Sequence, residues 1–178
     1  MQQMTGINAI VTQATTIVGS NPSLAVFSPY VSIVINSFQF LAALSTVAIL
    51  SKAGRKPLIL LGNLGLGLTD FGIGILLIFS SWSPSGVFTL VLLIIYMIIF
   101  GLSVGPAIWL YVPEIIPAKI FPLATMTNWF GCALCIIFTP MAIEANNGNA
   151  YPLFFFFGGL TLFFFIMNTF LMVETKGK

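Results

Sequence analysis

Carboxamide side chains are the polar groups that stand out in an otherwise apolar sequence. A carboxamide can donate and accept hydrogen bonds at once, so a cluster of them suits a neutral polyhydroxyl ligand. An adjacent aromatic ring could cover the apolar face of such a ligand. The same amides could instead form ordinary hydrogen bonds between helices, and the pattern alone leaves both interpretations open. The amides in question are Gln2, Gln3, Asn8, Asn36, Gln39 and Asn128, and the last is followed by Trp129.

Several kinds of chemistry are excluded by the residues that the sequence lacks. There is no histidine, which removes histidine-based metal sites and histidine-centred acid–base catalysis. We therefore expect no enzyme, no metal and no cofactor. The two cysteines, Cys132 and Cys135, are three residues apart on one helix face, where small packing residues are a simpler interpretation than a redox pair. Six scattered basic residues do not make a nucleic-acid interface.

The composition is that of an integral membrane protein. Of the 178 residues, 58% are hydrophobic and 6% are charged, whereas a soluble domain carries about 25% charged residues. The mean hydropathy is +1.09. The apolar runs are continuous rather than alternating, which favours transmembrane helices over a barrel. The fold class is therefore an all-α membrane protein.

Charged residues and turn residues divide the chain into six apolar segments. Five are long enough to cross a hydrocarbon core of about 30 Å, and the first is the shortest and most polar. We expect one six-helix transmembrane domain over residues 1–178. The segments run over residues 1–19, 24–50, 57–80, 87–112, 121–143 and 151–173.

The basic residues are distributed asymmetrically among the connections. If six helices cross the membrane in alternating directions, all six basic residues fall on one face of the membrane and none on the other. The positive-inside rule then places that face, with the C-terminus, in the cytosol or matrix of a multi-pass protein. The residues are Lys52, Arg55, Lys56, Lys119, Lys176 and Lys178.

Asp70 is the one charged residue deep within a segment. It could belong to a proton relay, or it could be a carboxylate in a solvated groove or a buried hydrogen-bonded one. Gly101 and Gly105 form a GxxxG pattern that predicts close helix packing. The phenylalanine runs 154–157 and 163–165 are typical of lipid-facing surface.

A split into three plus three segments pairs the first with the fourth. We expect both to be interrupted, at Thr5-Gly6 and at Gly105-Pro106. Matching interruptions in two repeats indicate the binding site of a transporter.

Ordered motifs along the whole chain resemble the C-terminal half of a sugar porter of the major facilitator superfamily. The resemblance implies a half bundle of six helices and a site for a hexose-type sugar. The motifs are Gln2-Gln3-Met4-Thr5-Gly6-Ile7-Asn8-Ala9, Asn36, Ala53-Gly54-Arg55-Lys56-Pro57-Leu58, Gly105-Pro106-Ala107-Ile108-Trp109-Leu110, Pro113-Glu114-Ile115-Ile116-Pro117, Asn128-Trp129 and Glu174-Thr175-Lys176-Gly177.

The resemblance also implies roles for individual residues. The sugar-binding set would be Gln2, Gln3, Asn8, Asn36, Trp109, Asn128 and Trp129, and the charge network that gates the inner face would keep Arg55, Lys56 and Glu114. The family pattern differs at Ser51, Phe121 and Val173, where it usually has Glu, Arg and Pro. The family also has twelve spans, with the site between two halves, and the first half is absent here.

Two functions follow from these features. The first is transport of a hexose-type sugar, only together with a partner half. The alternative is a non-transporting structural subunit of a larger membrane complex, such as a respiratory-type assembly. In both cases we expect other membrane polypeptide to cover the first, second, fourth and fifth segments, and lipid to contact the third and sixth. Amides that face hydrocarbon are unfavourable, so some protein must cover them.

Overall fold

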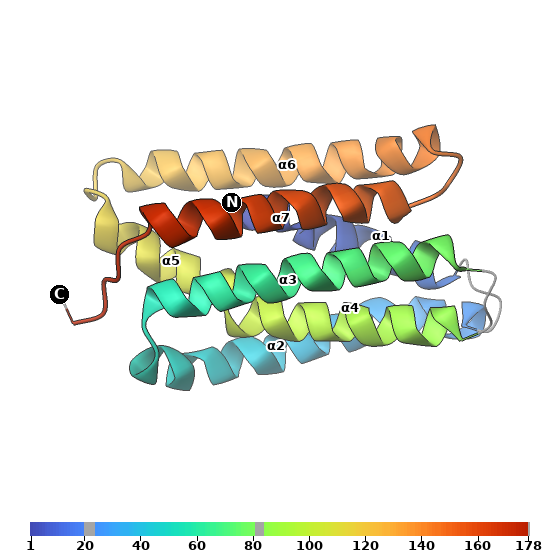
Figure 1. The fold of residues 1–178 in the computed structure, drawn as a ribbon, viewed down its shortest axis with the longest axis horizontal. Helices are drawn as coiled ribbons and strands as arrows, with labels where there is room; N and C mark the ends of the chain where they lie inside the picture. Colours follow the sequence, from blue (N-terminus) through green and yellow to red (C-terminus); the bar gives the residue numbers. More distant parts are fainter. Residues whose placement is uncertain (20–23, 81–83, 178) are drawn as a thin grey trace.

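The computed structural model describes residues 1–19, 24–80 and 84–177, and in these ranges the regular structure is helical. The turn expected at Asn21–Ser23 and the residues Trp82 and Ser83 lie outside this part of the chain. Most of the helices run side by side along the long axis (Figure 1). In chain order they are η1 (Gln2–Thr5), α1 (Ile7–Gly19), η2 (Ala25–Phe27), α2 (Ser28–Lys52), α3 (Arg55–Ile78), α4 (Ser85–Leu102), α5 (Val104–Ile115), α6 (Phe121–Ala145) and α7 (Tyr151–Leu171).

Proline marks the first turn of four long helices. A proline has no N–H, and the first turn of a helix is where that donor would be unpaired in any case. Among the described residues, five helical stretches are long and apolar enough to cross a membrane. The first segment is shorter because it is divided into η1 and α1. The prolines are Pro29, Pro57, Pro122 and Pro152. The stretches that could cross a membrane are Ala25–Leu50, Arg55–Ile78, Ser85–Ile115, Phe121–Ala145 and Tyr151–Leu171.

The break expected at Thr5-Gly6 is confirmed. Gly6 has a φ of 84°, in the left-handed region that favours glycine. A Cβ atom at Gly6 would also lie 3.0 Å from the ring of Phe157. Glycine is therefore required at this position both by the backbone conformation and by the close approach of α7.

The break in the fourth segment lies at Ser103 and not at Gly105-Pro106. Ser103 has a φ of −131° and a ψ of −95°, and it separates α4 from α5. The reason is the proline ring, which removes the N–H that would bond the carbonyl of Leu102 and also crowds that carbonyl. The distortion therefore appears one turn before the proline.

The main core lies between α1, α2, α3, α4 and α7. It includes Ile10, Ile35, Leu66, Tyr96 and Phe154, which are all nearly or fully buried. Burial of such side chains contributes roughly 1.5–3 kcal/mol each in a soluble protein. Within a bilayer the gain comes instead from tight packing and hydrogen bonds between helices.

The phenylalanine runs do not lie wholly against lipid, which corrects the sequence interpretation. Phe154 and Phe157 are buried, at 2% and 4% exposure, whereas Phe156 and Phe163 are exposed. The run covers consecutive positions, so a helix necessarily points some of them inward.

Gly101 provides the close helix contact that the GxxxG pattern predicts. A Cβ atom there would lie 2.7 Å from the carbonyl oxygen of Gln39 in α2. Thr46 of α2 donates a hydrogen bond to the Gly101 carbonyl at 2.7 Å. The absence of a side chain at Gly101 thus lets α2 and α4 approach each other.

Asp70 is neither solvated nor hydrogen-bonded, contrary to one of the two interpretations of the sequence. Its side chain has 0% exposure, and neither carboxylate oxygen has a hydrogen-bond partner among the described residues.

The described basic residues gather at one end of the bundle. The α2–α3 connection, the α5–α6 connection and the C-terminal tail all lie at the left in Figure 1. Arg55 pairs with Glu114, and Lys176 bonds the carbonyl of Lys52, so these loops are in contact. The opposite end carries the exposed Glu144 and asparagines after it.

This arrangement predicts opposite accessibility for the two ends of the bundle in a membrane. We expect a membrane-impermeant thiol reagent to label Lys119→Cys from the cytosolic or matrix side and Asn149→Cys from the other side, because Lys and Arg are retained on the inner face. The parent chain, with its buried Cys132 and Cys135, is the control for background labelling. Labelling of both variants from the same side would contradict the topology.

Candidate functional site

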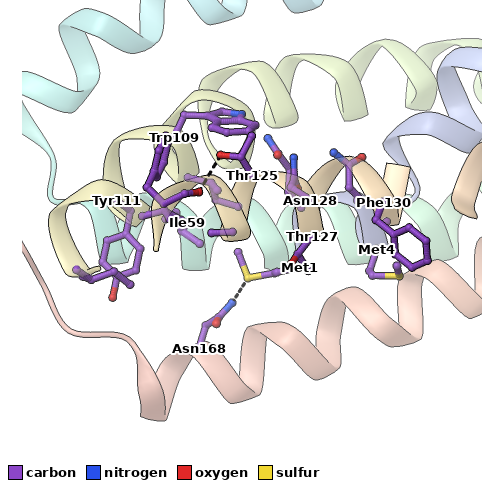
Figure 2. A pocket seen from close by; sticks show the side chains of 18 of the residues that line it. Met1, Met4, Ile59, Trp109, Tyr111, Thr125, Thr127, Asn128, Phe130 and Asn168 are labelled. Atoms are coloured by element: carbon purple, nitrogen blue, oxygen red, sulfur yellow. Dashed lines mark hydrogen bonds between the residues drawn. The ribbon is translucent and has the colours of Figure 1, made fainter. Parts of the chain in front are cut away.

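A cleft of about 460 Å³ lies between α5, α6 and the N-terminal residues, with contributions from α3 and α7. This volume is in the range of small-molecule sites, which is roughly 300–1,000 Å³. Figure 2 shows side chains from these elements pointing toward a shared space. Most of the lining is apolar, with a few polar groups: Gln2, Gln3, Trp109, Tyr111, Thr125, Thr127, Asn128 and Asn168.

Two glutamines on η1 supply amides to the cleft. Gln2 donates through Nε2 to the carbonyl oxygen of Gly105 at 2.9 Å, which joins the break in the first segment to α5. Gln3 accepts through Oε1 from Nδ2 of Asn8. These bonds fix both side chains and leave Gln2 Oε1 and Gln3 Nε2 to offer to a ligand.

The short helix η1 is itself held from two sides. The Tyr96 hydroxyl of α4 donates to the backbone carbonyl of Thr5, and the Thr5 hydroxyl donates to the carbonyl of Gln2 at 2.9 Å. The Sγ of Cys135 on α6 lies 3.4 Å from the carbonyl of Gln3 and donates to it. Backbone carbonyls at a helix break must be satisfied inside a membrane, and these three side chains satisfy them.

Asn128 on α6 carries an unused donor. Its Nδ2 is buried and has no hydrogen-bond partner within the described structure. Thr125 lies three residues earlier on the same helix and donates to the carbonyl of Phe121 at 3.1 Å (Figure 2). A buried donor without a partner is unfavourable by roughly 1–3 kcal/mol, which a ligand oxygen could recover.

The helix α5 presents an aromatic ring to the cleft and lacks one of its regular backbone hydrogen bonds. Trp109 lines the cleft beside the amides. Pro113, four residues later, lies inside the helix and has no N–H to bond the Trp109 carbonyl. The ring could stack on a ligand while the carbonyl accepts a hydrogen bond.

The structure brings together four of the seven sugar-site residues expected from the sequence. Gln2, Gln3, Trp109 and Asn128 line the cleft, and Asn8 contacts it through Gln3.

The other two expected residues lie away from the cleft. Asn36 is exposed on α2 and donates to the carbonyl of Ser32 at 2.7 Å. Trp129 is 60% exposed on α6 and does not line the cleft.

Sequence reasoning missed several lining residues. Asn168 donates to the sulfur of Met1 across the mouth between α7 and the N-terminal residues (Figure 2). Asn168 is the one amide side chain in the phenylalanine-rich last segment, and this isolated amide could have indicated a lining position. The sequence contained no indication of Tyr111 and Thr125 apart from their spacing. Tyr111 follows Trp109 by two residues, and Thr125 precedes Asn128 by three.

A charged cluster occupies the basic end of the bundle. Arg55 binds Glu114 through both Nη2, at 2.9 Å, and Nε, at 3.2 Å, and Thr175 donates to the other oxygen of Glu114. Of the three network residues expected from the sequence, Arg55 and Glu114 bind each other, whereas Lys56 binds neither of their side chains. Its Nζ donates to the carbonyl of Thr169 on α7 at 3.0 Å.

Glu174 is a member of this cluster that sequence reasoning did not assign. Its carboxylate accepts from the backbone N–H groups of Arg55, at 2.9 Å, and Lys56, at 3.2 Å, and so caps the start of α3. It also accepts from Thr175 and Lys176, both at 3.0 Å. The signal for it was the Glu-Thr-Lys-Gly motif.

The surroundings of Glu174 favour its ionised form. Partial burial acts to raise the pKa of this carboxyl, but the four backbone N–H bonds prevail and hold its pKa below the ordinary 4.5. Gly54 makes room for it, because a Cβ atom at Gly54 would lie 2.1 Å from Glu174 Oε2.

The fold and the cleft together define a class of protein: a helical membrane bundle with broken helices beside a cleft. The family model described as "Sugar (and other) transporter" matches residues 1–178. The chain therefore belongs to the sugar transporter family, and its fold is the six-helix half bundle of the major facilitator superfamily.

Curated relatives are transporters of greater length. The chain is 27% identical over 186 residues to the putative metabolite transport protein YwtG of Bacillus subtilis and covers 40% of it. It is 30% identical to hexose transporter 1 of Plasmodium vivax, of which it covers 36%, and 31% identical to trehalose transporter 1 of Drosophila melanogaster, of which it covers 21%. At least 99% of this chain is aligned in each case.

Solved structures share the fold. The proton:xylose symporter XylE bound to 6-bromo-6-deoxy-D-glucose superposes with a TM-score of 0.85 at 22% identity, over 99% of this chain and 38% of XylE. The inward-open conformation of XylE from E. coli gives a TM-score of 0.70 at 24% identity, over 98% of this chain and 39% of that one.

The Glu174 cap predicts a stability difference that depends on pH. A carboxyl with a lowered pKa in the folded state stabilises the fold above its ordinary pKa of 4.5, and this contribution is lost as the pH falls through the lower folded value. We expect Glu174→Gln to lose about 1 kcal/mol at neutral pH, as other helix caps do, and to approach wild type in acid. Thermal unfolding in detergent at several pH values measures it.

Gly54→Ala is the matched variant for this prediction, because its methyl group would displace the same carboxylate. The two substitutions should therefore be non-additive. Additive losses of stability, or a Glu174→Gln effect that is independent of pH, would show that the loss of stability does not come from the Glu174 cap.

Proposed function

We propose that this chain forms the sugar-binding half of a transporter for hexose-type sugars, and that it transports only together with a partner half. The buried, unused Nδ2 donor of Asn128 carries the proposal, because it lies in a cleft that Gln2, Gln3 and Trp109 also line. Hydroxyl groups of a sugar are the complementary partners of such amides. The apolar remainder of the lining suits the carbon faces of the ring.

The need for a partner follows from the surfaces left uncovered. Along α6 only Cys132, Cys135 and Thr139 are buried. Asn36 and Trp129 stand on exposed faces of α2 and α6, and in this proposal they join the sugar site once the partner half covers these helices. Lipid surrounds the rest of the bundle, and no catalysis is involved.

Relatives support the substrate class. Two of them are named hexose and trehalose transporters, and XylE has been solved with a deoxyglucose derivative. The chain spans about two-fifths or less of these proteins, so the activity of the whole protein is proposed for the assembly and not for this half alone.

The sugar site predicts that loss of a lining amide weakens hexose binding. Gln2→Ala, Gln3→Ala and Asn128→Ala should each cost about 1–3 kcal/mol, or roughly 5- to 150-fold in the dissociation constant, because partner groups of the sugar lose their hydrogen bonds. Isothermal titration with glucose in the assembled complex measures this. Asn149→Ala, an amide at the exposed end of the bundle, is the control. Equal affinity in all four variants would exclude the cleft as the site.

The partner dependence predicts a stable complex in mild detergent. Native mass spectrometry of the protein taken from its own membrane should give a mass well above 19.3 kDa after detergent and lipid are removed. The chain alone in liposomes should take up no glucose. A 19.3 kDa monomer that keeps its helicity and transports hexose would contradict this proposal.

A further inference from the structure

Asp70 lies within α3 and faces the interior of the bundle. Its side chain has no exposure, and neither of its carboxylate oxygens has a hydrogen-bond partner in the part of the chain that the structure describes. Asn63, Leu66 and Ile73 share this face of α3 at helical spacing, and they are also fully buried. Asp70 is the only aspartate in the sequence.

The helices packed against Asp70 offer few partners. Gly158 of α7 is close, since a Cβ atom there would lie 3.3 Å from the Cβ of Asp70. Thr161, one turn further along α7, is buried, and its hydroxyl also has no hydrogen-bond partner in the described structure. Tyr96 of α4 is near enough to interact electrostatically with Asp70.

The proton of the Tyr96 hydroxyl is already engaged, because it is donated to the carbonyl of Thr5. A tyrosine hydroxyl has a single proton, so toward Asp70 it can only accept. Cys135 of α6 is the next titratable group on that side, where it interacts with Tyr96. An ionised carboxylate, which can only accept, finds no donor in Tyr96.

No described lysine or arginine lies at this depth, and the terminal amino group of Met1 interacts with Cys135 and not with Asp70. The described basic residues lie at one end of the bundle (Figure 1). Arg55 is on the same helix, but fifteen residues at 1.5 Å each separate it from Asp70 by about 22 Å. Arg55 is also paired with Glu114.

We propose that Asp70 is a proton-binding site, which holds its proton at neutral pH in the folded, membrane-embedded chain. A fully buried carboxylate with no hydrogen bond or counter-ion from the described residues is so unfavourable that the group takes up a proton instead. Protonation removes the charge, so the carboxyl no longer requires a counter-ion in the interior of the bundle. The site is distinct from the cleft, and the proposal does not depend on sugar transport.

The packing around Asp70 also predicts slow exchange of this proton. A Cβ atom at Gly67 would lie 2.9 Å from Leu162 and 3.4 Å from the carbonyl of Gly158, so α3 and α7 are in close contact beside Asp70. The proton can reach water only when these helices separate. Its exchange rate therefore reports the opening of the α3–α7 contact.

The single aspartate allows a test without any substitution. The full chain, made by cell-free synthesis with aspartate labelled with carbon-13 at the side-chain carboxyl and placed in lipid bilayers, gives one labelled carboxyl in solid-state NMR. We expect the chemical shift of a protonated acid at neutral pH, unchanged from mildly acidic to mildly alkaline conditions. The carbonyl stretch in the infrared should move only slowly after transfer to deuterated buffer. A carboxylate signal at neutral pH, or an ordinary aspartate titration, would overturn the proposal.

A matched variant supplies the control. Asp70→Asn combined with Glu144→Asp places the only aspartate at the exposed end of α6, and it keeps a neutral side chain at position 70. The label in this variant should titrate as an ordinary carboxyl. If the wild-type and variant labels behave alike in this comparison, then position 70 does not hold a proton.

Discussion

The hydrogen bond from Gln2 to the carbonyl of Gly105 joins the two broken segments of the bundle, and the cleft depends on it. A membrane offers no water to satisfy the polar groups of an interrupted helix, so each break must be closed by protein. At the first break, Tyr96 and Cys135 donate hydrogen bonds to the η1 carbonyls of Thr5 and Gln3. The side chain of Gln2, which belongs to η1, donates to the carbonyl of Gly105 at the start of α5. The groups that stabilise the breaks are thus also those that shape the cleft.

Contacts of α6 with the rest of the described chain are mainly with α1 and η1, and fewer are with α5 and α7. Gly131 lies against Gln3, where a Cβ atom would come within 3.5 Å, and Cys135 bonds the Gln3 carbonyl. Since α6 buries only three of its residues, its position depends on these small contacts with α1 and η1. Asn128 therefore reaches the cleft because α1 and η1 hold α6 in place.

The sequence predicted the fold well because its signals were of a kind that a bilayer enforces. Continuous apolar runs, basic connections and first-turn prolines each limit where a helix can lie, and the resulting segments agree with the structure. The site was predicted in part. Gln2 and Asn128 were predicted from their motifs. The break at Ser103 was not, because its position depends on which carbonyl the proline ring crowds. The burial of Phe154 was not, because it depends on how α7 is rotated about its axis. Asn36 and Trp129 stand on exposed faces of α2 and α6 outside the cleft, because helix rotation, which their motifs do not specify, decides which face a residue occupies.

The charged end of the bundle shows how a network with substituted members can remain joined. Ser51, Phe121 and Val173 replace residues that sugar porters usually have, yet Arg55, Glu114 and Thr175 are still connected and Glu174 still caps α3. The cap uses backbone N–H groups, which are present whatever side chains surround them. It ties the C-terminal tail to the start of α3, while the pair of Arg55 and Glu114 ties α3 to the end of α5. The helix α5 also carries Trp109 and the carbonyl that receives Gln2, so one helix joins the charged end of the bundle to the cleft.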